Sequence, residues 1–302
     1  MNNDAEPSAG PSLLHFSRTA EVVAHDVIDA YSTSFGIATR LLGKRHRAHV
    51  RNIYALVRVA DEIVDGVASE AGLSPNEQAE ALVRYRDETH RAMGCGYSSD
   101  LVVHAFALTA REAGIDESLT QPFFDSMLAD VTGLSGEQAV FDAREHTEYV
   151  YGSAEVVGLM CLRVFLRNSI VSDTEQERLV HGARSLGAAF QNINFLRDLA
   201  DDTARLGRSY LGVEGTLTDG DRDRWVSEVR HQLAEAKEAI PLLPIDARAA
   251  VRSAWELFAA LTNKVARTSA SELYRRRIRV ADPIKLGIAA RALMVTLKEG
   301  KK

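Results

Sequence analysis

Apolar residues recur with a helical period along much of this chain. Leu179, Ala183, Leu186, Phe190 and Ile193 follow one another at alternating steps of four and three residues. This spacing places all five side chains on one face of an α-helix, because a helix completes a turn every 3.6 residues. The segment therefore predicts an amphipathic helix whose apolar stripe faces the interior of the protein.

Helical patterns of the same kind cover five further stretches, whereas the alternation typical of strands is absent over any useful length. The five stretches are residues 46–66, 77–93, 142–168, 246–279 and 284–298. Ser74 and Ser172 are each followed three residues later by a glutamate, the spacing of a capping box at a helix start. We therefore predict one all-α domain of about ten helices over residues 13–302, preceded by a disordered tail of residues 1–12.

Composition and charge exclude several classes of protein. The chain has 302 residues, 46% hydrophobic and 26% charged, as in ordinary soluble globular proteins. Its 36 basic and 42 acidic residues give a net charge of −6, so it lacks the basic field of a nucleic-acid-binding protein. Two cysteines are too few for a disulfide framework and indicate a reducing cytoplasm. No uninterrupted apolar run reaches the roughly 18 residues of a membrane span, and the acidic N-terminus is unlike a signal peptide.

Two rows of polar residues at helical spacing lie within apolar segments. Asp61 and Asp65 are four residues apart and share one helix face, which Arg58 and Tyr54 continue toward the N-terminus. The second row has the same rhythm of three and four residues. It consists of Gln191, Asn194, Asp198 and Asp202.

A divalent cation between the two rows would compensate their charges. Mg²⁺ prefers carboxylate oxygens and binds substrate phosphates with them, and the Asn194 amide can add a neutral oxygen. The alternative is that each row is a solvated helix face, because acidic pairs at this spacing arise by chance in a chain with 42 acidic residues. The apolar neighbours and the adjacent Arg58 and Arg197 favour a buried site, since buried charges need partners.

Five segments resemble, in the same order, the signatures of the squalene and phytoene synthases. They are Tyr31-Ser32-Thr33-Ser34-Phe35, the first acidic row at 58–65, Tyr149-Val150-Tyr151-Gly152 with Gly158, the second acidic row at 191–202 followed by Gly207-Arg208-Ser209-Tyr210-Leu211, and the basic segment 277–285. The resemblance covers nearly the whole chain, and the sequence of residues 189–199 is closest to the bacterial phytoene synthases of this family.

The resemblance implies an isoprenoid-synthase fold, with helices around a central apolar channel, and a Mg²⁺-dependent prenyltransferase. Its metal-binding positions correspond to Asp61, Asp65, Asn194, Asp198 and Asp202, with Mn²⁺ as the alternative ion. Its diphosphate-binding positions correspond to Ser32, Ser34, Arg58, Arg197, Arg208, Tyr210 and Arg277. Phe35, Thr39 and Gln191 are expected to line the channel. Tyr54 and Tyr149 are expected to face the carbocation or to assist the final proton loss, together with the catalytic Arg58 and Arg197.

The family chemistry leaves the length of the substrate open. Gly36, Ala38 and Thr39 follow Phe35 and are small, which favours a channel long enough for two geranylgeranyl diphosphates and phytoene as the product. The alternative is a squalene or dehydrosqualene synthase that uses farnesyl diphosphate. Two other classes are a catalytically silent helical lipid-binding or assembly protein, which the intact acidic rows disfavour, and a class I terpene cyclase, which the serine and arginine signatures disfavour.

Other expectations concern partners and departures from the family pattern. We expect no NADPH and no nucleic acid, and a cytoplasmic protein, monomeric or weakly dimeric, in peripheral contact with the inner face of the plasma membrane. The basic cluster at 44–51 is predicted as a solvated surface that can touch anionic lipid. Glu62 and Asp201 replace the residues common in the family but keep their charge. The segment 130–149 lacks the sequence usual in the family, so we assign no site role to Asp130.

Overall fold

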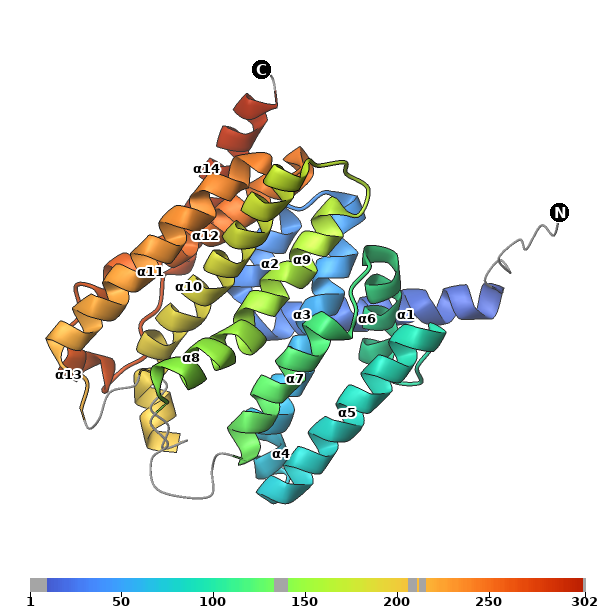
Figure 1. The fold of residues 1–302 in the computed structure, drawn as a ribbon, viewed down its shortest axis with the longest axis horizontal. Coiled ribbons are helices and arrows are strands. Elements are labelled where there is room, and N and C mark those ends of the chain that lie inside the picture. Colours follow the sequence, from blue (N-terminus) through green and yellow to red (C-terminus); the bar gives the residue numbers. More distant parts are fainter. Residues whose placement is uncertain (1–9, 133–140, 206–210, 212–215, 301–302) are drawn as a thin grey trace.

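The computed structural model describes residues 10–132, 141–205, 211 and 216–300, and at 65 and 201–205 it describes the backbone alone. Every regular element in these ranges is a helix, which confirms the predicted all-α class (Figure 1). The elements are α1 (Pro11–Tyr31), α2 (Thr33–Arg40), α3 (Lys44–Asp65), α4 (Val67–Glu70), α5 (Pro75–Cys95), α6 (Leu101–Ala113), α7 (Glu117–Thr132), α8 (Ala143–Val150), a π-helical turn (Tyr151–Glu155), α9 (Val156–Leu166), α10 (Asp173–Arg205), α11 (Asp219–Ala239), a 3₁₀ turn (Ile240–Leu242), α12 (Ile245–Val265), α13 (Ala270–Leu273) and α14 (Asp282–Glu299). Helix α1 begins at Pro11, two residues before the expected start of the domain.

Side chains at the helix starts set several of these boundaries. The Ser74 hydroxyl accepts the Glu77 N–H, and the Glu77 carboxylate accepts the Ser74 N–H at 2.8 Å, so the predicted capping box starts α5. Ser172 and Glu175 form the same reciprocal pair at the start of α10, with distances of 3.3 and 3.1 Å. Each box satisfies two backbone donors that a helix start would otherwise leave unpaired.

The apolar pattern at 246–279 predicts one helix, but the structure divides it between α12 and α13. Helix α11 causes the break. Its Arg222 donates to the Thr268 carbonyl at 2.6 Å, and its Asp219 carboxylate accepts the Ala270 N–H at 2.7 Å. These side chains replace helical backbone partners, so the chain turns there. This division, together with the short α4, raises the number of described helices above the predicted ten or so.

Helix α8, the π-helical turn and α9 form one continuous rod, apolar in its α9 part, that packs against α7 on one side and α10 on the other (Figure 1). A Cβ atom at Gly152 would lie 2.2 Å from the Pro122 carbonyl oxygen, and one at Gly187 would lie 2.5 Å from the Ala154 carbonyl oxygen. Any side chain at these two positions would force the helices apart. Glycine therefore allows the backbones to approach each other closely.

The same rod, Ala143–Leu166, is the one helix in the described ranges with the length and apolarity of a membrane span, at a mean hydropathy of 1.4. Core helices of soluble proteins share these properties. Its contacts with α7 and α10 account for its composition as that of a central core helix.

The start of α3 is joined to α9 and α12 by a cluster of charged and polar side chains. Arg45 donates two hydrogen bonds to the Asp246 carboxylate, at 2.7 and 2.9 Å. The fully buried His46 lies between Asp246, 3.2 Å from its Nε2, and Arg167, 3.1 Å from its Nδ1. The sequence predicted a solvated surface here, which is wrong for His46, because Asp246 comes from a helix 200 residues away. Burial lowers the pKa of His46, so its ring is neutral. The Nδ1 atom then accepts a hydrogen bond from Arg167, and the Nε2 atom donates one to Asp246.

Hydrogen bonds from Arg45 lower the pKa of the Asp246 carboxyl from 3.8 to about 2. Because this pKa is lower in the folded than in the unfolded protein, the ionised carboxylate stabilises the fold at pH values above the unfolded-state pKa. This contribution is lost as the pH falls from about 4 to about 2. We therefore expect Asp246→Asn to lower the free energy of unfolding at pH 7 by about 1–2 kcal/mol. The difference from the wild type should shrink below about pH 4.

Urea denaturation between pH 3 and pH 7 measures this difference. Asp26→Asn is the matched control, because the Asp26 side chain is 77% exposed and should leave stability unchanged. A pH-independent effect of Asp246→Asn would contradict the charge-based explanation.

Candidate active site

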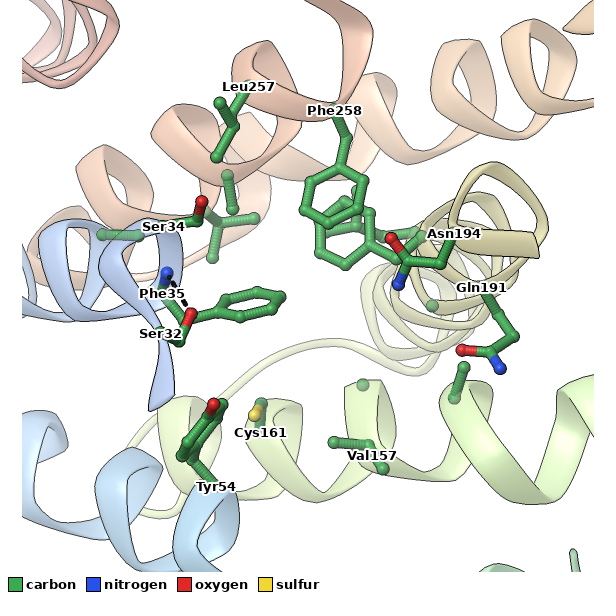
Figure 2. A pocket seen from close by; sticks show the side chains of 18 of the residues that line it. Ser32, Ser34, Phe35, Tyr54, Val157, Cys161, Gln191, Asn194, Leu257 and Phe258 are labelled. Atoms are coloured by element: carbon green, nitrogen blue, oxygen red, sulfur yellow. Dashed lines mark hydrogen bonds between the residues drawn. The ribbon is translucent and has the colours of Figure 1, made fainter. Parts of the chain in front are cut away.

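A cavity of about 1090 Å³ lies between α2, α3, α9, α10 and α12, beside the start of α14 (Figure 2). Its lining changes from apolar to polar along both α3 and α10. On α3 the lining runs from Val50 to Asp61, and on α10 it runs from Leu179 to Asp198. The cavity thus has an apolar part beside the N-terminal halves of these helices and a polar part beside their C-terminal halves.

The start of α2 contributes hydroxyl groups to the polar part. The Ser32 hydroxyl accepts the Phe35 N–H at 3.1 Å and thereby caps α2 (Figure 2). Ser34 also lines the cavity, and Lys285 at the start of α14 lies 3.2 Å from the Thr33 hydroxyl. A helix N-terminus with neighbouring hydroxyls and a lysine is suited to binding an anion such as a phosphate.

The first acidic row is carried by the C-terminal half of α3. Tyr54, Arg58 and Asp61 all line the cavity, as their shared helix face predicts. The Arg58 guanidinium forms an ion pair with Glu62, lies 4.0 Å from an Asp61 carboxylate oxygen and stacks 4.4 Å from the ring centre of Tyr31. Arg58 is therefore held beside the row by an acid and an aromatic ring.

The second acidic row is carried by α10, on the other side of the cavity. Gln191, Asn194 and Asp198 line it, so the two rows face one space. Asp198 accepts hydrogen bonds from Arg197 at 2.8 Å and pairs with Nε of Arg277 at 2.7 Å. Two arginines thus compensate the charge of this carboxylate.

The chemistry of the described donors fits a divalent cation. The Oδ1 atom of Asn194 is buried and has no hydrogen-bond partner among the described residues, and Asn194 lines the same cavity as Asp61 and Asp198. Leaving such an acceptor unpaired is costly unless a ligand or water uses it. The described side chains contain no cluster of three or more His, Cys, Asp or Glu residues suited to a metal. The carboxylates of Asp65 and Asp202, which would complete each row, lie outside the described side chains.

The apolar part forms the predicted channel. Phe190 and Phe258 stack with their ring centres 3.7 Å apart, and Phe35 lies 6.0 Å from each. Beyond Phe35, the buried Thr39 donates its hydroxyl proton to the Gly36 carbonyl at 3.1 Å, so its polar group is satisfied within α2. The rest of the lining is apolar and includes Leu42, Val50, Phe165, Leu179, Ile240 and Leu243.

A buried tyrosine–aspartate pair joins the rod to α7. The Tyr149 hydroxyl donates to the Asp130 carboxylate at 2.7 Å, and both residues line the cavity. Asp130 was not among the predicted site residues, although a lone acid between Met127 and Val131 on a buried helix face was a usable signal. Burial raises the pKa of Tyr54, another tyrosine of the cavity, so its phenol stays protonated at neutral pH.

The structure brings most of the predicted site residues to one cavity. Those that line it are Ser32, Ser34, Phe35, Thr39, Tyr54, Arg58, Asp61, Tyr149, Gln191, Asn194, Arg197, Asp198 and Arg277. Arg208, Tyr210 and the side chains of Asp65 and Asp202 lie outside the described residues. The predicted site did not include Thr33 or Lys285, although both lie within segments that resemble the family signatures, at 31–35 and 277–285.

Sequence comparison agrees with this geometry. A model of the squalene/phytoene synthase family matches residues 28–282. A phytoene synthase of Pseudescherichia vulneris is 33% identical over 188 residues, which cover 61% of this chain and 56% of that protein. A 15-cis-phytoene synthase of a Paracoccus strain is 28% identical over 87% of each chain. A phytoene synthase of Rhodobacter capsulatus is 26% identical over 84% of this chain and 75% of its own length.

Solved structures share the fold at low sequence identity. A dehydrosqualene synthase crystallised with a ligand superposes with a TM-score of 0.73 and 22% identity, over 95% of this chain and 99% of that one. The squalene synthase HpnC from Alicyclobacillus acidocaldarius gives 0.67 and 15%, over 87% and 97%. With the family match over most of its length and two acidic helix rows on one cavity, this chain belongs to the squalene/phytoene synthase family.

Proposed function

We propose that this protein is a phytoene synthase, which joins two geranylgeranyl diphosphates head to head to prephytoene diphosphate and converts that to phytoene. The observation that carries the proposal is the cavity, in which the polar row residues Asp61, Asn194 and Asp198 adjoin an apolar channel. Such a cavity suits a molecule with a charged head and a long hydrocarbon tail. The bacterial relatives named phytoene synthase support the C20 substrate.

The polar residues of the cavity have distinct tasks in this proposal. Asp61, Asn194 and Asp198 bind Mg²⁺, or Mn²⁺ as the alternative, and by their positions in the family Asp65 and Asp202 complete the set. When bound, the ion compensates the negative charge that develops on the departing diphosphate. The proposed reaction uses no nicotinamide cofactor, because phytoene formation needs no reductant.

The arginines of the site exchange partners when substrate binds. Arg58, Arg197 and Arg277 are paired with carboxylates, and a guanidinium can bind a phosphate with the same forked geometry. By turning to diphosphate oxygens they release the carboxylates for the cation. Ser32 and Ser34 assist at the start of α2, and Arg208 and Tyr210 join them by family position.

The apolar lining protects the carbocation that ionisation produces. Phe35, Phe190 and Phe258 exclude water, and their rings can stabilise a positive charge by cation–π interactions. For the final proton loss we assign Tyr149 rather than Tyr54. Its phenol oxygen can accept the substrate proton while its own proton passes to Asp130, to which it is already hydrogen-bonded.

A squalene or dehydrosqualene synthase is the second candidate. The structural neighbours of this type share the fold, at identities too low to transfer a substrate. A catalytically silent lipid-binding protein is disfavoured because it would have no need to keep Asp61, Asn194 and Asp198 on one cavity. A cyclase that binds one diphosphate is disfavoured as well, because it would not need the serines of α2.

Incubation of the purified protein with Mg²⁺ and either C15 or C20 prenyl diphosphate, without NADPH, tests the proposal. We expect a C40 hydrocarbon of the mass of phytoene from the C20 substrate, identified by mass spectrometry. Asp198→Ala should reduce its formation at least about 100-fold, because it removes an electrostatic contact made in the transition state. A C30 product alone would establish the second candidate, and no product from a folded protein that binds both substrates would establish the silent one.

Asn194 tests the cation site. We expect Asn194→Ala to raise the Mg²⁺ concentration for half-maximal activity at least about tenfold, because a neutral ligand oxygen is lost. Chelation with EDTA should abolish the activity of the wild type. Asn263→Ala, at an exposed asparagine that pairs with Arg230 on the surface, is the control and should keep the wild-type Mg²⁺ dependence. Identical Mg²⁺ titrations for Asn194→Ala and wild type would contradict the assignment.

Thr39 tests the length of the channel. Replacing it with phenylalanine should block the apolar part beyond Phe35 and shift use from the C20 to the C15 substrate, since no space remains for the additional isoprene unit. The ratio of C30 to C40 hydrocarbon from a mixture of both substrates measures this shift. Thr39→Val keeps the volume and should leave the ratio unchanged. An unaltered ratio for Thr39→Phe would show that the substrate does not extend past this residue.

A further inference from the structure

Arg184 of α10 contacts both ends of the π-helical turn. Its Nε atom donates a hydrogen bond of 2.6 Å to the carboxylate of Glu155, the last residue of the turn. Its guanidinium carbon also lies 5.3 Å from the ring centre of Tyr151, the first residue of the turn. One side chain from a neighbouring helix thus spans the whole turn.

The same turn also contributes to the wall of the cavity. Ser153 and Ala154, which lie between the two residues that Arg184 contacts, line the cavity, and so does Val157 just after the turn. The turn therefore has one side at the substrate space and another side that Arg184 holds.

The carboxylate of Glu155 depends on this arginine. The Glu155 side chain is only 13% exposed, whereas that of Arg184 is 49% exposed. A carboxylate with so little access to water needs a cationic partner, and Arg184 is the cation that pairs with it in the described part of the chain. Removing the arginine would leave a largely buried charge unpaired, which costs more than the loss of a solvated surface pair.

The backbone contact between the turn and α10 sets only the distance between them. At Gly187 an added Cβ would lie 2.5 Å from the Ala154 carbonyl oxygen, so the two backbones already touch there. A glycine has no side chain that could hold the turn in one orientation. The directional contacts come from Arg184, three residues earlier on the same helix.

From these contacts we propose that Arg184 is a positioning residue, which holds the π-helical turn in the shape that the second reaction step needs. The inference rests on the proposed function. In that scheme Tyr149, two residues before the turn, takes the last proton when prephytoene diphosphate becomes phytoene. A loosened turn displaces the wall beside Tyr149. It therefore slows this step more than the diphosphate binding that both steps share, because Asp61 and Asp198 lie outside the turn.

Arg184→Gln tests this role through the ratio of released prephytoene diphosphate to phytoene. We expect the ratio to rise at least about fivefold, with a KM for geranylgeranyl diphosphate within about twofold of the wild type, because substrate binding is kept. The ratio is independent of the fraction of molecules that fold, so a variant that is only less stable would not change it. Arg184→Lys keeps the charge and should restore most of the wild-type ratio. The matched control is Arg84→Gln, which breaks an exposed pair with Glu80 and should keep the wild-type ratio.

A double-mutant cycle shows whether Arg184 acts through Glu155. Glu155→Gln alone should raise the ratio by a similar factor, and the combined variant Arg184→Gln, Glu155→Gln should raise it no further than either single change. A wild-type ratio for Arg184→Gln, or effects that multiply in the combined variant, would overturn the proposal.

Hydrogen exchange keeps this result separate from that of the product assay, because it needs no turnover. We expect Arg184→Gln to accelerate amide exchange over residues 151–157 at least about tenfold, since the turn then opens more often, and Arg84→Gln to leave it unchanged. If the wild type forms no C40 hydrocarbon, the proposed function fails while the exchange experiment still measures the restraint on the turn. Unchanged exchange in Arg184→Gln would show that the arginine does not hold the turn.

Discussion

The pairing of Asp198 with Arg197 and Arg277 is the interaction on which the site depends. Two rows of acidic side chains on facing helices repel each other, and the repulsion grows as the cavity excludes water. Arginines beside each row compensate this charge in the protein as it stands. In the function proposed above, the same arginines turn to the diphosphate when a cation binds the carboxylates.

Close helix packing also shapes the cavity. The glycine at 187 lets α10 approach the α8–α9 rod, and the glycine at 152 lets α7 approach the rod. Ala154 and Gly187, which meet at the contact with α10, also line the cavity. Packing and site architecture thus share residues, because Gly158 and Ala183 at the contact between α9 and α10 also line the cavity. A larger side chain at Gly187 would therefore disturb both the helix packing and the cavity wall.

The sequence allowed the helices and the two acidic rows to be predicted, because each depends on the phase of a single helix, whereas the channel was implied by the resemblance to the family. Asp61 and Asp198 needed no tertiary information to be assigned to helix faces. Contacts between distant segments were not accessible in this way. Arg277 is 79 residues from Asp198, and Lys285 is 252 residues from Thr33. His46 was misplaced for the same reason, since its burial results from Asp246 on another helix.

The π-helical turn at Tyr151–Glu155 has a consequence for how this protein can change in evolution. A π turn accommodates one residue more than an α-helical turn, so the side chains before and after it are out of phase by about 100°. With this turn in place, Tyr149 before it, hydrogen-bonded to Asp130, and Val157 and Cys161 after it all line the cavity. Deleting a single residue from the turn would leave an intact helix with one of these faces rotated away. Selection must act on the number of residues in this turn, and not only on their identity.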